Sequence, residues 1–268
     1  MSLFVITGLA LALFMSAAMG LAWAVRMKTG KSGWIDAIWS AATGLACLAA
    51  ILLVAPGGYW GRKILAACLI LVWSGRLALH IVARTRGAGD DPRYAALARE
   101  WGVDFPRQLF VFLQIQAMAA LPLVLAVAVA AAAPQDFPAL TDLAAVLVAG
   151  GALLGEAIAD KQLANYRRSA KPGGICEIGL WRHSRHPNYF FEWLFWCAWP
   201  LLAFDPSGGW PQGLFALAAP ALIYWLLVHV SGVPPLERHM RATRGAAFEA
   251  YRRRVNVFFP GPASRENS

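Results

Sequence analysis

Residues 179–204 read GLWRHSRHPNYFFEWLFWCAWPLLAF, so a strongly polar segment runs directly into a strongly apolar one. The apolar half, from Trp193 onward, has the composition of a membrane-spanning segment. A hydrocarbon environment tolerates few polar groups, and those it holds usually have a function. The polar half crowds cations, hydrogen-bond donors and a carboxylate at one helix end, which suits an anionic ligand arriving from water. We therefore predict a functional site at this membrane boundary.

The composition of the whole chain agrees with a membrane protein. Of its 268 residues, 59% are hydrophobic and only 15% are charged, which is too little charge to keep the surface of a soluble domain wetted. We expect an all-α integral membrane protein with one domain over residues 1–260 and a disordered tail over 261–268. Apolar runs of about 20 residues predict a bundle of seven spans, at residues 3–25, 34–55, 64–83, 108–132, 142–164, 189–204 and 213–230.

The positive charges alternate between the connections of these spans. Of the 24 Lys and Arg residues, 21 fall on one side, in the connections near residues 26–31, 84–107 and 161–185 and in the tail. Only Arg62 and Lys63 lie on the other side, and Arg76 is inside the third span. The positive-inside rule then predicts an outside N-terminus and a cytosolic C-terminus. It also explains the net charge of +9, so we expect no nucleic-acid partner. No basic segment precedes the first apolar run, which favours a retained span over a cleaved signal peptide.

Three polar residues of the early spans are candidates for inward-facing roles. Asp36 begins the second span in KSGWIDAIW, where it is either a first-turn carboxylate favoured by the helix dipole or part of a site. Arg76 and His80 are four residues apart on the third span and share one helix face. Arg76 lies about two turns deeper than Arg84, so simple snorkelling to the interface is the weaker explanation.

The fifth predicted span ends in GEAIADKQLANYRR, which aligns three charged side chains. Glu156 and Asp160 are four residues apart, and Arg167 follows about two turns later on the same face. The spacing alone leaves two interpretations open. The three groups could form an internal ion pair, or they could bind the hydroxyl and phosphate groups of a ligand.

The polar segment at residues 182–192 gives the strongest signal. Arg182, Arg185 and His186 precede Pro187, which is suited to the first turn of a helix. Asn188 and Glu192, four apart, would project from the first turns of that helix. Helix N-termini attract anions, and planar arginine side chains suit phosphate. A positive-inside cluster at the bilayer surface would explain the arginines, but not Asn188 and Glu192.

The C-terminal region reads SGVPPLERHMRATRGAAFEAYRRRVNVFFPGP. Glu237 and Arg241 share one face of a predicted helix, and Tyr251 lies beyond. A polybasic helix on anionic lipid is the alternative interpretation. We expect breaks at Gly245 and at residues 234–235, and we expect the aromatic residues 257–260 to fold back on the bundle.

Several common motifs are missing from the sequence. Neither G-x-G-x-x-G nor G-x-x-x-x-G-K-[ST] occurs, so no Rossmann or P-loop nucleotide site is predicted. The four cysteines have no C-x-x-C spacing, which argues against a disulfide framework or a metal cage. His183 and His186 lack a zincin-type set of neighbours, and we expect no metal.

The same residues resemble a known family, the bacterial steroid 5-alpha-reductase-like membrane proteins, a domain of unknown function. The resemblance covers most of the chain, through GWIDAIW, VWSGRLALHIVAR, DDPRYAALAREWG, EAIADKQLANYRR, GLWRHSRHPNYFFE and SGVPPLERHMRATRG with FEAY and FFPGP. The RHPNY core is shared more widely with sterol C14 reductases and isoprenylcysteine carboxyl methyltransferases. Phe191 departs from the pattern, because these families usually have Gly there, and its bulk is expected to reshape the cleft.

The resemblance implies a seven-helix bundle in the bacterial inner membrane that takes NADPH from the cytosol. The family pattern places a carboxylate and a tyrosine on earlier helices against the substrate carbonyl, and Asp36 and His80 are the positional candidates for catalysis here. By the same analogy the cofactor would be lined by Asp160, Arg167, Trp181, Arg182, His186, Asn188, Tyr189, Glu192, Glu237, Arg241 and Tyr251.

Three functions from different classes follow as expectations. The first is an NADPH-dependent reductase of an activated carbon–carbon double bond in a lipophilic, steroid-like substrate. The second is a membrane methyltransferase that uses S-adenosylmethionine, since RHPNY occurs in that branch too; the many arginines favour the phosphate-rich NADPH. The third is a non-catalytic lipid-binding or transport protein, although inverted repeats with broken helices are not seen in the sequence.

Overall fold

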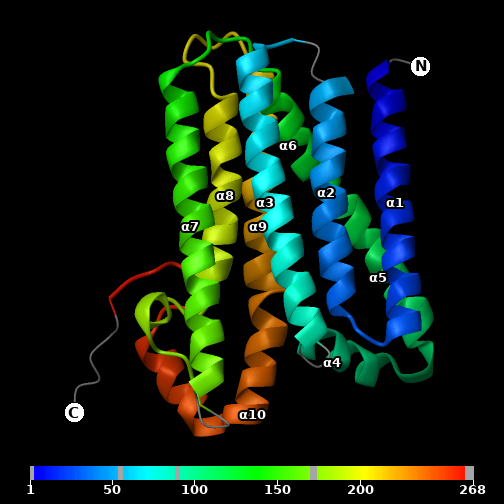
Figure 1. The fold of residues 1–268 in the computed structure, drawn as a ribbon, viewed down its shortest axis with the longest axis vertical. Coiled ribbons are helices and arrows are strands. Elements are labelled where there is room, and N and C mark those ends of the chain that lie inside the picture. The colour runs from blue at the N-terminus through cyan, green and yellow to red at the C-terminus, as the bar shows by residue number, and fades with distance from the viewer. Residues whose placement is uncertain (1–2, 54–56, 88–90, 170–173, 263–268) are drawn as a thin grey trace. The chain divides into compact units, whose positions relative to one another are not determined.

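The computed structural model describes residues 3–53, 57–87, 91–169 and 174–262, and in these ranges the regular structure is helical, without a strand. Lys171, Arg265 and the expected disordered residues 263–268 lie outside the described residues. The elements, labelled in part in Figure 1, are α1 (Leu3–Thr29), α2 (Gly33–Leu53), α3 (Trp60–Gly87), α4 (Pro92–Trp101), η1 (Gly102–Asp104), α5 (Phe105–Ala119), α6 (Leu121–Ala131), α7 (Leu140–Ser169), η2 (Gly179–Arg182), α8 (Pro187–Ala203), η3 (Pro211–Leu217), α9 (Ala218–Trp225), η4 (Leu226–Val230) and α10 (Val233–Arg254).

Six helical segments within the described residues are long and apolar enough to cross a membrane: Val5–Thr29, Gly33–Leu53, Trp60–Gly87, Arg93–Ala131, Leu140–Ser169 and Pro211–Arg254. This finding fits an integral membrane protein. The seventh predicted span, at residues 189–204, falls in α8, which has only 17 residues. That length is at the lower limit for crossing a hydrocarbon core, so the count of seven and the orientation of the termini stay predictions.

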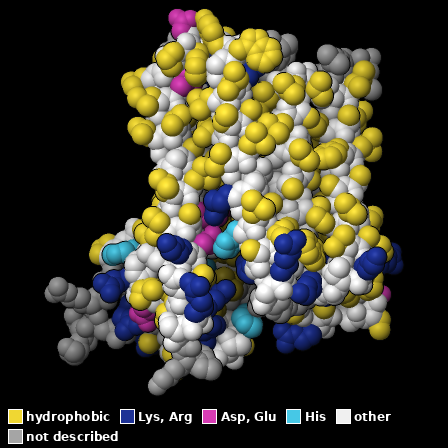
Figure 2. Space-filling model, viewed as in Figure 1, with side chains coloured by type: hydrophobic (Ala, Val, Ile, Leu, Met, Phe, Trp, Pro, Cys, Tyr) yellow, Lys and Arg dark blue, Asp and Glu magenta, His cyan; other side chains and the backbone are white. Residues whose placement is uncertain are grey.

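Two compact units make up the chain, and α7, α8 and α9 each pass from one into the other. Unit 1 comprises Met1–Ala144 and Trp199–Ala219, and unit 2 comprises Ala145–Ala198 and Pro220–Ser268. In each unit, Lys and Arg side chains gather toward one end of the helices, beside a broad apolar band (Figure 2), as expected for an interfacial boundary.

Unit 1 is built on α2, which packs against α1, α3 and α6, while α1 also packs against α5. Small residues permit this close packing. A Cβ added to Gly44 of α2 would lie 2.3 Å from the Ser74 hydroxyl of α3, so the two backbones approach closely, as small residues allow between membrane helices.

One fully buried arginine joins distant parts of unit 1. The Arg62 side chain, in the first turn of α3, donates from Nε and Nη2 to the two oxygens of Asp142 at 2.8 and 2.9 Å. It also donates to the carbonyl oxygens of Ala133, Gln135 and Asp136 at 2.7–3.0 Å. Arg62 was expected in a short outside connection, and the structure places it in α3, where it ties the connection between α6 and α7 to this helix.

Unit 2 contains most of α7, α8 and α9, and all of α10. Pro187 occupies the first position of α8, as predicted, because its missing N–H needs no partner there. The predicted break at Gly245 is confirmed, whereas residues 234–235 lie inside α10 and the break before this helix falls at residues 231–232. Gly232, before the two prolines, has a non-helical backbone at the start of α10, and Gly245 interrupts α10 with a φ of 50°. A residue with a side chain adopts such a φ only with strain, so α10 bends at this glycine.

The aromatic residues after α10 fold back, also as predicted. Phe258 is 1% exposed and its ring meets those of Phe190, Trp193 and Tyr224 at centroid distances of 5.4–6.0 Å in edge-to-face geometry. Such aromatic pairs each add about 0.5–1.5 kcal/mol beyond area burial. The tail is thereby held against α8 and α9.

Candidate functional site

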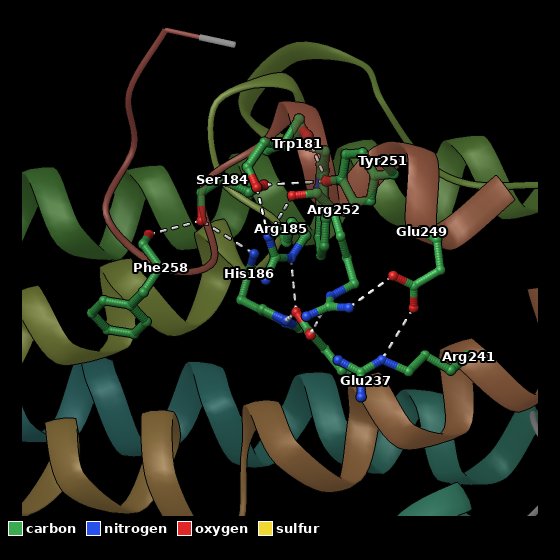
Figure 3. A network of polar contacts seen from close by, with 11 residues as sticks. Trp181, Ser184, Arg185, His186, Glu237, Arg241, Glu249, Tyr251, Arg252 and Phe258 are labelled. Atoms are coloured by element: carbon green, nitrogen blue, oxygen red, sulfur yellow. Dashed lines mark hydrogen bonds and ion pairs between the residues drawn. The ribbon is translucent and has the colours of Figure 1, made fainter. Parts of the chain in front are cut away.

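Three segments of unit 2 meet at the cation-rich end of its helices. They are the loop from η2 into α8, the helix α10, and the tail that follows α10. Figure 3 shows Arg185 and His186 from the loop pointing toward Glu237 of α10, with Arg252 beside them. The polar stretch within residues 179–192 is therefore part of a side-chain network.

Glu237 is the central acceptor of this network. Its Oε1 lies 2.8 Å from Arg185 Nε and 3.2 Å from His186 Nε2, and its Oε2 lies 3.3 Å from Arg252 Nε. Ion pairs continue outward from Arg252 to Glu249 at 2.9 Å and from Glu249 to Arg241 at 3.3 Å. The predicted residues His186, Glu237 and Arg241 are thus brought into one chain of contacts.

The loop is fixed by the tail as well as by α10. Arg185 N–H donates to the Asn256 carbonyl at 2.9 Å, and Gly261 N–H donates to the His183 carbonyl at 3.0 Å. The buried Ser184 hydroxyl donates to the Phe258 carbonyl at 2.8 Å. The Arg185 guanidinium donates to the Val255 carbonyl at 2.6 Å, where a cation complements the C-terminal end of a helix. We call residues 183–186 with residues 255–261 the tail clasp.

The environment of His186 sets its protonation state. Its side chain is buried, and this burial lowers the pKa of His186 below the ordinary value; the contact with Glu237 opposes the shift and the Arg185 cation adds to it. His186 is therefore neutral near pH 7, with the proton on Nε2 to donate to Glu237. The neutral His186 side chain thus helps to hold the loop before α8 in position against Glu237 of α10.

Trp181 and Tyr251, both predicted to line the cofactor, are engaged with the backbone. Trp181 donates from its indole nitrogen to the Ala159 carbonyl of α7 at 3.0 Å. The buried Tyr251 hydroxyl donates to the Trp181 carbonyl at 2.7 Å. These two bonds connect α7, η2 and α10, so both side chains fix the positions of these elements around the site.

A second set of polar side chains lies between α7 and α8. Asn188 Nδ2 donates to Asp160 Oδ1 at 3.5 Å, which is a long contact, and both side chains are half-buried. One turn along α8, Glu192 accepts from the Trp196 indole at 3.0 Å. Tyr189 stacks on His186 with ring centroids 5.5 Å apart. The structure thus brings Asp160 and Asn188 together, two residues that the resemblance placed at one site.

The predicted cationic residues differ in their surroundings. Arg167, at the end of α7, and Arg241, on α10, are exposed, which leaves them able to meet a ligand from water. Arg182 is also exposed, but it lines a groove along α7. Glu156, whose ligand-binding role the sequence left open, is buried in α7.

The two predicted catalytic residues belong to unit 1. Asp36 is at the start of α2, where it forms an ion pair with Arg93 and accepts a hydrogen bond from the Tyr94 hydroxyl at 3.1 Å. Arg93 also pairs with Asp91 at 2.9 Å. His80 is half-buried on α3. Asp36 is therefore one member of a cluster of ion-paired and hydrogen-bonded side chains, and not only a first-turn residue favoured by the helix dipole.

Sequence reasoning missed the roles of Arg93, Tyr94 and Arg252. A local signal for the first two exists in DDPRY. Asp91 caps α4 by accepting the Arg93 N–H at 3.0 Å, and Pro92 follows at the first helical position, which is a helix-start pattern. Burial alone would raise the pKa of Asp91, but the Arg93 cation and its hydrogen bonds lower it. Arg252 carries no such signal, because it is one of three consecutive arginines.

A protein-family model described as protein of unknown function (DUF1295) matches residues 22–255 of the chain. The matched region includes residues of both units. No curated protein and no solved structure matched the chain. Among the described residues, no group of three or more His, Cys, Asp or Glu side chains is placed to hold a metal ion.

Proposed function

We propose that this chain, which belongs to the family described as protein of unknown function (DUF1295), is an NADPH-dependent membrane reductase. Its substrate would be a lipophilic, steroid-like molecule with an activated carbon–carbon double bond. The resemblance of the motifs to steroid 5-alpha-reductase-like proteins supports this activity. The observation that carries it is the convergence in unit 2 of α7, the loop before α8 and α10, through Asp160 with Asn188 and Arg185 with Glu237.

The donor set of unit 2 fits a phosphorylated dinucleotide. Carboxylate and amide groups suit ribose hydroxyls, and exposed arginines suit phosphates because their planar forks bind oxygens in pairs. NADPH, when bound, supplies the hydride. We propose that Asp160, Asn188, Arg167 and Arg241 contact it directly.

The remaining predicted residues have positioning roles in this proposal. Glu237, His186, Trp181 and Tyr251 are already engaged with protein groups. They hold the loop that leads into Asn188 and Tyr189 of α8 in one geometry, which is what a preorganised binding site requires. Arg182 and Glu192 stay candidates on the strength of the resemblance.

In unit 1, the proposal assigns the substrate's oxygen to the Asp36 cluster. Asp36 is paired with Arg93 and accepts a hydrogen bond from Tyr94. The Tyr94 phenol is the neighbouring group with a proton to donate. We propose that the single phenol proton of Tyr94, which Asp36 accepts here, turns to the enone oxygen as negative charge develops there. His80 remains the alternative donor.

Binding of NADPH tests the assignment in unit 2. Asn188→Ala is expected to weaken NADPH binding about tenfold, because a hydrogen bond of about 1 kcal/mol is lost together with the fixed position of Asp160. Isothermal titration of the full chain in detergent measures this. Asn165→Ala is the matched control, since Asn165 lies exposed on α7 and contacts Arg168. Equal affinities of the Asn188 variant and the unmodified chain would reject the assignment. Binding of S-adenosylmethionine but not NADPH would favour the methyltransferase.

Turnover tests the assignment in unit 1. With 4-androstene-3,17-dione as the probe, Tyr94→Phe is expected to lower kcat roughly 100-fold, the usual cost of one oxyanion donor, and to leave the NADPH affinity unchanged. Asp36→Asn should lower kcat less than Tyr94→Phe does. His80→Gln is the comparison variant. If only His80→Gln abolishes turnover, the donor is His80 and the role of Tyr94 is refuted.

A further inference from the structure

A groove of about 530 Å³ runs along one face of α7 within unit 2. On α7 it is lined by Gly151, Leu154, Gly155, Ile158 and Gln162. From Gly151 to Gln162 the helix rises about 16 Å. This part of α7 belongs to a candidate membrane span, so the apolar part of the groove borders hydrocarbon if the helix crosses the bilayer.

Glycines create the apolar part of the groove. A Cβ added to Gly151 would meet nothing within 4 Å, so the groove is open at this position. At Gly155 the space is taken by Phe191 of α8, whose ring would lie 2.3 Å from an added Cβ. Leu154 and Ile158 are 67% and 49% exposed. Phe191, the residue that departs from the family pattern, therefore forms one side of the groove, next to Gly155 of α7.

The polar end of the groove carries Arg182 and His183, both exposed. Their loop is held in place on α7. Leu180 N–H donates to the Gln162 side chain at 2.9 Å. The Gly179 backbone, with a φ of 54°, lies so close to that side chain that a Cβ would be 2.2 Å away. His183 Nδ1 is also 3.3 Å from the Gly261 carbonyl. The groove thus has Arg182 and His183 in a fixed position at one end of its apolar part.

We propose that this groove binds an anionic phospholipid of the surrounding bilayer. An acyl chain would lie along Gly151, Leu154 and Ile158, and the phosphate would meet Arg182 and His183. The volume is typical of small-molecule sites, and an arginine near a helix end is placed where lipid phosphates lie. This site does not depend on the reductase activity proposed above.

The main competing occupant is a helix of a second copy. Gly151 and Gly155 have the spacing of a helix-packing motif in membranes. However, Phe191 already fills the position beside Gly155, so a second backbone could not approach there. A partner helix also gives no reason for the paired Arg182 and His183. These two observations favour the lipid.

Native mass spectrometry of the full chain, without NADPH, tests the proposal. The protein is exchanged into detergent with equal amounts of phosphatidylglycerol and phosphatidylcholine that carry the same acyl chains. We expect retained phosphatidylglycerol to exceed phosphatidylcholine by roughly fivefold, the preference given by one arginine near an anionic headgroup. Arg182→Gln should bring the ratio close to one, while the total retained lipid changes little.

Two glycine variants separate the groove from the rest of the helix. Gly151→Leu should fill the groove and remove most of the retained lipid. Gly150→Leu is the matched control, since an added Cβ there also meets nothing within 4 Å and Gly150 does not line the groove; it should leave retention unchanged. Equal retention of the two lipids by the unmodified chain would overturn the proposal. So would equal losses in the two glycine variants, or a dimer that Gly151→Leu dissociates.

Discussion

Replacing Arg62 with methionine is expected to lower the free energy of unfolding by about 3–5 kcal/mol, the usual cost of removing one partner of a buried ion pair. Arg62 is 0% exposed and Asp142 is 2% exposed, so the variant leaves a carboxylate buried without its countercharge. It also leaves the carbonyl oxygens of Ala133, Gln135 and Asp136 without this donor. The midpoint of thermal unfolding in detergent should fall by roughly 10 °C.

The matched control for this prediction is Arg84→Met. Arg84 also pairs with an aspartate of unit 1, Asp91, but at 3.4 Å and with 42% of its side chain exposed. An exposed pair contributes less than about 1 kcal/mol, so the midpoint should move by only a few degrees. Similar losses in both variants would show that Arg62 is not the closing contact of the connection between α6 and α7.

The second large effect is expected at Glu237. Glu237→Leu removes the common partner of Arg185, His186 and Arg252. The Arg185 side chain, 9% exposed, would then be a buried cation without a carboxylate, which costs about 3–5 kcal/mol. Because Arg185 also holds the tail clasp, residues 255–261 should become accessible to protease. Limited proteolysis with mass mapping, together with the melting midpoint, measures both consequences.

Two further variants make this test specific. Glu249→Leu removes a carboxylate from the same helix, but the Glu249 side chain is 43% exposed, and the loss should stay below about 1 kcal/mol. Glu237→Gln keeps an acceptor oxygen and loses only the charge, so its effect should be intermediate. If Glu237→Leu melts like the unmodified chain and its tail stays protected, Glu237 does not organise the loop.

The local features of this fold could be predicted from the sequence. Apolar runs indicated most of the long helices, Pro187 indicated the start of α8, and Gly245 indicated the break in α10. These signals are local because hydropathy and backbone preference depend on neighbouring residues. Hydropathy also located the segment of α8, but this helix has 17 residues, a length from which hydropathy cannot decide whether it crosses the membrane.

The contacts that organise the site could not be predicted in the same way. His186 and Glu237 are 51 residues apart, and Arg62 and Asp142 are 80 residues apart. Neither pairing follows from helical spacing, which relates residues only three or four positions apart. The sequence drew attention to the residues around RHPNY, but it could not show that Glu237 is shared by Arg185 and Arg252.

The tail clasp has a consequence for biosynthesis. Phe258 is translated 74 residues after Ser184, its hydrogen-bonding partner, which takes several seconds at the usual speed of a ribosome. The loop before α8 thus emerges long before the backbone groups that fix it exist. The candidate site is consequently the last part of unit 2 to assemble, and a nascent chain stalled before residue 255 would carry its helices but no ordered site.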